Sequence, residues 1–456
     1  MTTTIFAKQA LTSAGWLQNV VVAIGADQRI KNITQGLSFA DHHVGILLPA
    51  LSNVHSHSFQ RAMGGLAEKR GVKSQDDFWT WRKVMYGFLE ILSPDDIEAI
   101  AAQVQLDMIK SGYAASAEFH YLHHAQNGQQ YAQVEELSLR HFTAALQTGI
   151  GYTHLPVLYM QGGLDGKKLQ AGQLRFGCNI DQFQSLYSAL SANMKLLPKD
   201  AVLGVAPHSL RAVTLDGLRQ CKVISPSGPI HIHAAEQVGE VKEVNQFLGA
   251  PPIRWLLDNM SVDGRWCLIH ATHMKHDEIR DFALSGAVAG LCPITEANLG
   301  DGIFNASSFL QQGGTFGIGT DSNVKIALSE ELRMPEVSQR LRDKKRVVLC
   351  NTNTPSNGRY LYEEAARGGA KAIGRDSGRI EIGALADLVA LDDQHSSLVA
   401  LEGDTVLDTW IFTCNDDAVT DVWSAGRQVL QNRVHQHEEK IANRFLMTIK
   451  KLRQAL

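Results

Sequence analysis

The sequence predicts an α/β fold, a (β/α)8 barrel of the TIM type with a small composite β-sandwich beside it. Three observations support this prediction. Through the middle of the chain, short apolar runs alternate with amphipathic segments of helix length. Both ends of the chain instead carry β-rich runs separated by turns. With 456 residues and 44% hydrophobic content, the chain is long enough for one large domain and a smaller one.

The central elements follow one another in a regular order. The apolar runs predict strands over residues 50–57, 113–119, 150–159, 202–208, 229–235, 266–271, 287–292 and 315–320. The amphipathic segments predict helices over residues 94–110, 133–148, 181–196, 239–248, 276–285, 330–349 and 358–373. Strands that alternate with helical sequence in this way form parallel sheets, and eight of them close most simply into a barrel.

The two β-rich ends are expected to fold together, although they lie far apart in the sequence. Residues 1–47 and 375–435 would form the composite β-sandwich, and residues 48–374 the barrel. The last segment, residues 436–456, has the pattern of a C-terminal helix.

Composition excludes several classes of function. The net charge is −4 with interspersed signs and no Lys/Arg block, so no nucleic-acid partner is expected. No apolar stretch reaches the ~18–20 residues of a membrane span, and the first residues lack the pattern of a signal peptide. The six cysteines never form a CxxC pair, which is typical of reduced thiols. We therefore expect a cytoplasmic protein without a membrane partner. We also expect a homodimer.

The most informative motif is His55-x-His57, at the end of the first predicted barrel strand. Residues two apart in a strand share a face, so both imidazoles can bind one metal ion. Alone this motif is weak, because the chain has 18 histidines. It gains weight from His233 and Asp321, which end the fifth and eighth predicted strands. Three imidazoles and a carboxylate suit one Zn²⁺ ion, or Fe²⁺.

Two further residues at strand ends suit proton transfer. A metal of this kind lowers the pKa of a coordinated water from ~15.7 to about 7. Glu236, three residues after His233, is placed to carry a proton to a departing nitrogen. His270, at the end of the sixth predicted strand, is placed to orient the water or polarise the bond under attack.

Each assignment has a competitor in the sequence. His231 shares a face with His233, and the spacing to Glu236 favours His233 as the ligand. His273 competes with His270, which is attached directly to the apolar run. Glu236 has an alternative as a solvated carboxylate at the start of a helix. Five other histidines are expected at the surface: His123, His124, His395, His435 and His437.

These motifs resemble those of the amidohydrolase superfamily, nearly end to end. The shared features are His55-x-His57, His233-x-x-Glu236, His270, the run 319–322 around Asp321, and the closing run 384–389. The resemblance implies a barrel with a composite sandwich and a single hydrolytic metal, because residues 201–208 lack the lysine of binuclear members. It also implies that Asp321 either binds the metal or takes the proton of the water, and the sequence does not separate these roles.

Within that superfamily the chain is similar to the formiminoglutamate deiminase family. The features that carry this are the runs 57–63, 78–82, 118–123, 206–211 and 292–302. The resemblance implies hydrolysis of N-formimino-L-glutamate to N-formyl-L-glutamate and ammonia, within histidine degradation. It assigns catalysis to Glu236, His270 and Asp321. It assigns binding of the dicarboxylate substrate to Gln60, Arg82, Tyr121, His208 and Arg211.

The residue chemistry supports some of these binding roles more than others. An arginine offers a planar fork that matches a carboxylate, and Arg211 and Arg82 are the candidates. Arg82 has an alternative as a surface arginine stacked on Trp79 or Trp81. Gln60 and Tyr121 have alternatives as packing residues. Two other functions stay open, a deaminase of an aromatic base on the same metal set, and a metal-free binding scaffold on the same fold.

Overall fold

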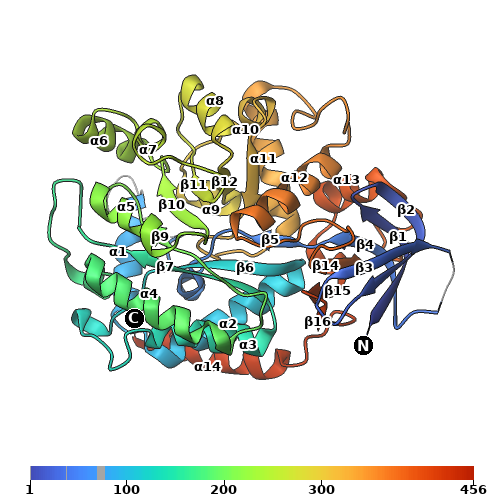
Figure 1. Cartoon of the computed structure of the whole chain (residues 1–456), viewed down its shortest axis with the longest axis horizontal. Coiled ribbons are helices and arrows are strands. Elements are labelled where there is room, and N and C mark those ends of the chain that lie inside the picture. Colours follow the sequence, from blue (N-terminus) through green and yellow to red (C-terminus); the bar gives the residue numbers. More distant parts are fainter. Residues whose placement is uncertain (1, 37–38, 69–77, 456) are drawn as a thin grey trace.

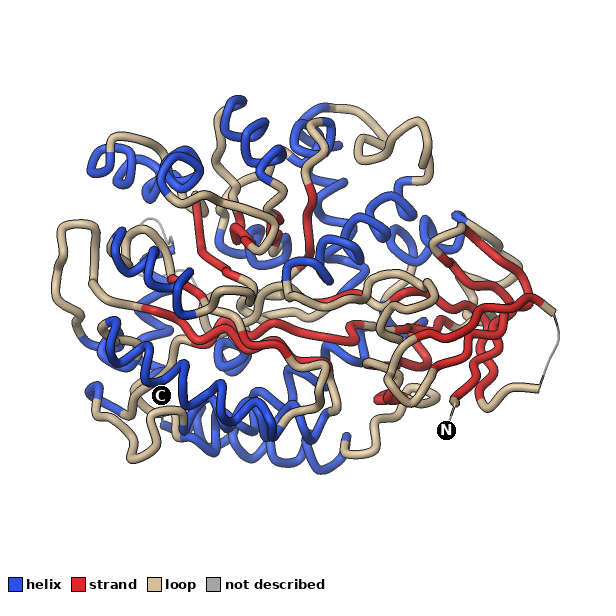
Figure 2. The backbone as a smooth tube through the Cα atoms, viewed as in Figure 1, coloured by secondary structure: helices blue, strands red, loops and turns tan. Residues whose placement is uncertain are grey.

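The computed structural model describes residues 2–36, 39–68 and 78–455, without the side chains of residues 78–80, 82 and 83. Its larger part is a curled sheet of parallel strands with helices on the outside (Figure 2). Its smaller part is a second sheet, built from both ends of the chain, which lies on the right in Figure 1. The architecture is therefore mixed α/β, as the sequence predicts.

The parallel strands lie at the positions of the predicted apolar runs. One hydrogen-bonded group contains β5 (Leu51–Asn53), β6 (Tyr113–His120), β7 (Gly151–Leu158), β8 (Val202–Leu203) and β9 (Ala206–Pro207). The other contains β10 (Ile230–Ala234), β11 (Trp266–His270), β12 (Val288–Leu291) and β13 (Thr315–Ile318). All neighbouring pairs within these groups are parallel.

Backbone hydrogen bonds join the two groups at both of their edges. At one edge, Val205 and Ile230 form a parallel bridge, and the His233 amide donates to the His208 carbonyl at 3.1 Å. At the other edge, the Val54 amide donates to the Ile318 carbonyl at 3.0 Å, and Ser56 bridges Asp321. These bonds bring the carboxyl ends of β5, β10 and β13 to one end of the curled sheet.

The helices that follow the strands cover the outside of this sheet (Figure 1). They are α2 (Pro94–Ser111), α3 (Glu136–Thr148), α4 (Ile180–Asn193), α5 (Leu215–Ile224), α6 (Val238–Leu248), α7 (Pro252–Asn259), α8 (His276–Ser285), α9 (Pro293–Leu299), α10 (Ala306–Gln311), α11 (Leu328–Asp343) and α12 (Asn357–Ala372). Local signals set their ends. For α2, Ser93 and Asp96 form a capping box before Pro94, and Gly112 ends the helix in the left-handed conformation. Helix α1 (Phe78–Leu89) precedes α2. The C-terminal helix α14 (Glu438–Ala455) packs against α2.

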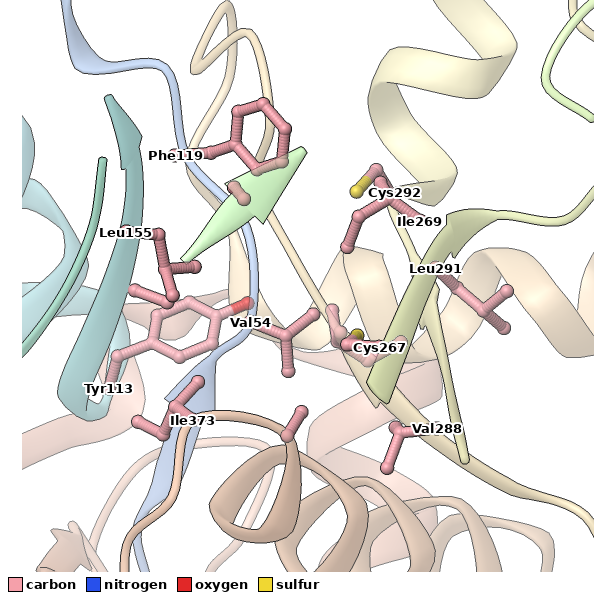
Figure 3. Packing of buried hydrophobic residues seen from close by; sticks show 14 of the residues in the cluster. Val54, Tyr113, Phe119, Leu155, Cys267, Ile269, Val288, Leu291, Cys292 and Ile373 are labelled. Carbon is pink, nitrogen blue, oxygen red and sulfur yellow. The ribbon is translucent and has the colours of Figure 1, made fainter. Parts of the chain in front are cut away.

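The interior of the curled sheet is filled by apolar side chains from successive strands. Figure 3 shows Val54, Tyr113, Leu155, Cys267 and Val288 meeting there. Each of these residues is fully buried. This close packing makes the strand ends a rigid base for the polar side chains that follow them.

The second sheet has seven strands in the order β16-β15-β14-β4-β1-β2-β3. Their bounds are β1 (Thr3–Thr12), β2 (Gly15–Ile24), β3 (Ile30–Gln35), β4 (His42–Pro49), β14 (Leu388–Leu391), β15 (Val419–Ser424) and β16 (Arg427–Leu430). The pairing of β4 with β14 joins the two ends of the chain. A separate apolar cluster, with Ile5, Val22, Leu388 and Trp423 among its members, packs on this sheet.

Three of the differences between the predicted elements and the structure have a clear physical cause or effect. The strand over 202–208 is split into β8 and β9 at Gly204, where a Cβ would lie 2.4 Å from the Pro229 carbonyl oxygen. The helix over 330–349 ends at Asp343, because Lys344 takes the left-handed conformation with φ 54°. Helix α13 (Asp404–Thr413) lies inside the C-terminal segment that was expected to be all β, and it packs against α11 and α12.

Among the described residues, no helix is both long enough and apolar enough to span a membrane.

Candidate active site

Three predicted metal ligands converge at the end of the curled sheet. The Nε2 atoms of His55 and His57 are 3.1 Å apart. The Nε2 atom of His233 lies 3.1 Å from that of His55 and 3.4 Å from that of His57. Ligand bonds of about 2.0–2.1 Å put the nitrogens of one tetrahedral ion roughly 3.3 Å apart. The three imidazoles therefore have the spacing of a metal site.

The hydrogen bonds on the far side of these rings point to the same conclusion. The Nδ1 atoms of His57 and His233 lie 3.0 Å from the Phe119 carbonyl oxygen and 3.1 Å from the His208 carbonyl oxygen. A carbonyl accepts only from a protonated nitrogen, so in both neutral rings Nε2 carries a lone pair. Burial lowers the pKa of both imidazoles, which favours these neutral rings. Facing lone pairs repel, and a cation between them removes the repulsion.

Asp321 lies between the three histidines and His270. Its Oδ1 atom is 3.3 Å from His57 Nε2 and 3.5 Å from His55 Nε2, while its Oδ2 atom is 3.9 Å from His270 Nε2. The backbone fixes this position, because the Asp321 amide donates to the His55 carbonyl at 2.9 Å. The φ angle of Asp321 is 46°, a left-handed conformation that turns the chain back at the end of the strand.

Glu236 and His270 complete the polar cluster. Their Oε1 and Nε2 atoms are 3.8 Å apart, and both side chains are buried. Burial, together with repulsion from Asp321 and Glu240, raises the pKa of Glu236 to about 7. Burial alone would lower the pKa of His270, but attraction to Glu236 and the hydrogen bond to Glu296 raise it well above its ordinary value. The site therefore pairs a buried carboxyl whose pKa is raised to about 7 with a buried imidazole whose pKa is raised well above its ordinary value.

A pocket opens directly onto these groups. His57, His233, Glu236, His270 and Asp321 lie on its polar side. The remaining lining residues are Gln60, Trp81, Met85, Tyr121, Tyr159, Phe176, His208, Arg211, Thr295 and Leu299. Four of the five predicted substrate-binding residues are in this set. The side chain of the fifth, Arg82, lies outside the described residues, and its backbone belongs to α1 beside the pocket residue Trp81.

Two residues that line this pocket each have a buried polar atom without a partner among the described residues. Among the described residues, no side chain or backbone group pairs with Nε of Arg211 or with Oε1 of Gln60, and both atoms are buried. The Gln60 amide nitrogen donates to the Tyr121 hydroxyl at 2.8 Å, which fixes the direction of the amide. Buried polar groups normally have partners. A bound ligand with acceptors for the guanidinium and a donor for Gln60 would supply them.

The competing histidines take other positions. His231 Nε2 donates to the Ala372 carbonyl at 2.8 Å, and His273 Nε2 to the Asp301 carbonyl at 2.7 Å. Neither is in the group of converging ligand atoms. The prediction that His123 and His435 lie at the surface is wrong. They are only 3% and 2% exposed, because each imidazole hydrogen-bonds a buried backbone carbonyl, Val157 and Thr148 respectively.

Several supporting residues were not found from the sequence. Glu296 Oε1 accepts from His270 Nδ1 at 3.2 Å and from the Cys292 amide at 2.8 Å, so it orients the imidazole. Asn53 clamps the end of β5 to the end of β13, since its amide accepts from the Thr320 backbone and donates to the Thr320 hydroxyl. A catalytic histidine commonly has a carboxylate partner, so a partner for His270 is expected. This rule does not say where in the sequence the partner lies.

Comparisons with known proteins agree with this geometry. The amidohydrolase family matches residues 46–429, and the N-terminal domain of the formimidoylglutamate deiminase HutF matches residues 2–41. A formimidoylglutamate deiminase from Pseudomonas aeruginosa is 45% identical over 454 residues, which is 98% of this chain and 99% of the relative. A 5-methylthioadenosine/S-adenosylhomocysteine deaminase from Haloarcula marismortui is 28% identical over 357 residues, 76% of this chain and 73% of the relative.

Solved structures give the same family. A crystal structure of an amidohydrolase from Brucella melitensis has a TM-score of 0.94 at 42% identity and covers 99% of both chains. The zinc complex of the atrazine chlorohydrolase TrzN from Arthrobacter aurescens has a TM-score of 0.83 at 20% identity, covering 98% of this chain and 100% of that one, and shows a shared fold alone. With its family match across most of the sequence and its close relatives end to end, the chain belongs to the amidohydrolase family.

Proposed function

We propose that this chain is a formimidoylglutamate deiminase, which hydrolyses N-formimino-L-glutamate to N-formyl-L-glutamate and ammonia in histidine degradation. End-to-end similarity to the Pseudomonas aeruginosa deiminase supports the assignment. The single structural observation that carries it is the pocket, whose lining includes Arg211 together with Glu236 and His270. A linear diacid that ends in a formimino group needs both features at once, a cationic anchor and a hydrolytic centre.

We further propose that the three histidines hold one Zn²⁺ ion, with Asp321 beside it. The spacing of the Nε2 atoms and the facing lone pairs of His57 and His233 support a cation at this point. Nitrogen donors with one carboxylate suit zinc better than magnesium or calcium. When bound, such an ion lowers the pKa of water and so supplies a nucleophile at neutral pH.

The chain's own residues then direct the protons. The Asp321 carboxylate takes the proton that the attacking water loses, and His270 holds the water oxygen in line with the formimino carbon. Attack, with transfer of the proton held by Asp321 to the imino nitrogen, gives a tetrahedral carbon that carries a hydroxyl group and the former imino nitrogen as an amine. Glu236, whose pKa is about 7 because of burial and nearby carboxylates, donates a proton to that nitrogen. The C–N bond then breaks with ammonia as the leaving group, which is a far better leaving group than an amide anion. As the formyl C=O forms, the hydroxyl proton passes to the Glu236 carboxylate, which restores its protonated form.

The remaining pocket residues hold the glutamate portion. The Arg211 guanidinium pairs with a substrate carboxylate, in the bidentate geometry that matches its planar fork. Gln60 accepts from an N–H of the substrate through its free Oε1. Tyr121 and His208 line the wall between these two groups and the histidines. Arg82 is the proposed partner of the second carboxylate.

We expect ammonia release to be fastest with N-formimino-L-glutamate. The screen compares this compound with other formimino amino acids, guanine, adenosine and cytosine, with ammonia as the measured product. Bases lack the carboxylates that Arg211 would bind, so they should be poor substrates. Faster release from guanine or adenosine would favour the aromatic-base deaminase instead.

The variant Arg211→Met tests the anchor. Loss of a charge-assisted pair of about 1.5–3 kcal/mol should raise KM for N-formimino-L-glutamate by roughly 10–100-fold. Steady-state kinetics measure this change. Arg219→Met on helix α5, where the side chain is exposed, is the matched control and should leave KM unchanged. An unchanged KM in Arg211→Met would remove the residue from substrate binding.

Metal content separates an enzyme from a binding scaffold on the same fold. Elemental analysis of the purified protein should find one transition-metal ion per chain, and His233→Ala should lower this occupancy. The physical reason is that two of three nitrogen donors hold a divalent ion much more weakly than three. Purified protein without a transition metal would favour the scaffold.

We propose the following division of the chain. Residues 48–374 form the (β/α)8 barrel, supported by the backbone bonds at both edges of the curled sheet. Residues 1–47 and 375–435 form the composite sandwich, supported by the pairing of β4 with β14 and by the separate apolar cluster. Residues 436–456 are the C-terminal helix. The cytoplasmic location and the homodimer stay predictions from the sequence.

A further inference from the structure

A second group of potential ligand atoms lies directly beside the three histidines. His270, Cys292 and Asp321 each offer one ligand atom, these atoms all lie within 4.8 Å of one another, and all three residues are buried. The proposed mechanism uses His270 and Asp321 but gives no role to the Cys292 thiol. The question is what a thiol does at this position.

The two groups share Asp321 but use opposite sides of its carboxylate. Oδ1 faces the three histidines, and Oδ2 faces His270 at 3.9 Å. A carboxylate between two clusters of donors is a common bridge between two metal ions, which then lie about 3.5–4 Å apart. The second group of ligand atoms therefore lies beside the three histidines, and an ion bound there would be additional to the first.

Cys292 reaches this point from the end of β12. In Figure 3 its sulfur lies at the same end of the packed interior as Phe119, whereas Cys267 lies lower, towards Val288. The centroid of the Phe119 ring lies 5.0 Å from that of His55 and 4.4 Å from that of His233. This end of the interior is therefore next to the three histidines proposed to hold the metal. A Cβ at Gly319 would lie 3.0 Å from the Cys292 sulfur, so the thiol also packs close to the turn that carries Asp321.

The charge around this group also favours a cation. The buried carboxyl groups of Glu236 and Glu296 lie 3.8 Å and 3.2 Å from the His270 ring nitrogens, in addition to Asp321. Burying negative charge without a counter-charge is costly. A divalent ion beside His270 would compensate this excess.

We propose that His270, Cys292 and Asp321 form a second site for a thiophilic divalent cation such as Zn²⁺ or Cd²⁺. Bonds of about 2.0–2.3 Å to nitrogen, oxygen and sulfur put ligand atoms roughly 3–4 Å apart, within about 1 Å of the spacing found here. A thiolate in the donor set selects zinc or cadmium against magnesium or calcium. Coordination displaces the thiol proton of Cys292 and the proton on the His270 nitrogen that binds the ion, and both protons leave to solvent.

Occupation of this site inhibits the enzyme, an effect that rests on the proposed function. An ion bound to His270 and Asp321 occupies the two side chains that hold the water and take its proton. Binding of the ion itself does not depend on any activity. The two aspects are therefore measured separately.

The binding experiment titrates Cd²⁺ into the holoenzyme that already carries one metal per chain. We expect thiolate-to-cadmium charge-transfer absorption that saturates with one added Cd²⁺ per chain, while elemental analysis shows that the first metal is retained. Cys292→Ala and Cys292→Ser should both lose this absorption. Cys267→Ala is the matched control, since Cys267 is also buried in the barrel interior but lies outside the ligand group. The Cys267→Ala variant should keep the thiolate-to-cadmium absorption.

Activity measurements on the same proteins test the inhibition. Cd²⁺ should inhibit the wild-type protein and the Cys267→Ala variant. In Cys292→Ala, the Cd²⁺ concentration for half-inhibition should rise by at least about tenfold, the usual lower bound for loss of a group that supports a metal site. Absorption that persists undiminished in both Cys292 variants, or Cd²⁺ that only displaces the first metal, would overturn the site. Protein that binds Cd²⁺ through Cys292 but never releases ammonia would overturn the proposed function and leave the site standing.

Discussion

Glu236→Gln is expected to retain the metal and to lose turnover by about 10²–10⁴-fold, the usual contribution of a positioned acid or base. The glutamine has the same shape but no proton that can be transferred to the departing nitrogen. Glu236 lies outside the set of converging imidazole nitrogens, so metal content should not change. The measurement is kcat for ammonia release together with elemental analysis of the same preparation.

The matched control for this variant is Glu243→Gln. Glu243 is an exposed carboxylate on helix α6, which begins two residues after Glu236, and its substitution removes the same charge from the neighbouring helix. This control should keep full activity. Normal turnover in Glu236→Gln would exclude the residue from the mechanism. Loss of the metal in that variant would instead make Glu236 part of the metal site.

The position of the site could be predicted because its residues end apolar strands. In a curled parallel sheet the carboxyl ends of the strands lie together, so His57, His233 and Asp321 are brought close by topology alone. The spacing to Glu236 favours His233 over His231, and in the structure His233 lies with His55 and His57. His231 lies earlier in the same strand, and it bonds the Ala372 carbonyl instead.

The supporting contacts could not be predicted because they join residues that are distant in the sequence and have no fixed spacing. Asn53 bonds Thr320, and the two are separated by 267 positions. His123 and His435 were expected in water because histidine is polar, but each satisfies a buried carbonyl. The break at Gly204 depends on the Pro229 carbonyl, which belongs to the next strand connection.

The closing run 384–389 was noted as a family feature, and the structure gives it a physical reason. Asp387 forms a bidentate pair with Arg375, at 2.8 Å and 2.9 Å. The same guanidinium donates to Asp200 at 2.9 Å, and Asp200 also pairs with Arg427 at 2.7 Å. Arg375 and Asp387 are fully buried. This ionic cluster connects the end of α12 and the segment before β8 to the second sheet.

Arg375→Met is therefore expected to destabilise the fold by about 3–5 kcal/mol, because it leaves the buried Asp387 without its charged partner and leaves Asp200 with Arg427 alone. Urea unfolding measures the loss. Arg379→Met is the matched control, since that arginine is partly exposed and pairs with Asp376 at the surface, where a salt bridge contributes about 0–1 kcal/mol. Equal stabilities of the two variants would contradict a structural role of the cluster.

The pH dependence of stability gives an independent test of the same cluster. Burial alone would raise the pKa of Asp387, but attraction to Arg375 and its hydrogen bonds hold the pKa below the usual value. A carboxyl with a lowered pKa in the folded state contributes stability that is present above its unfolded pKa of about 3.9 and is lost as pH falls below it. In Arg375→Met burial is opposed only by the hydrogen bonds from the Ala425 amide and Ser377, so the pKa of Asp387 rises and a penalty for its ionisation grows as pH rises. The variant should therefore lose most stability relative to the wild type near neutral pH, and the gap should narrow towards pH 4. A gap that stays constant over this range would show that Arg375 acts by packing and not by charge.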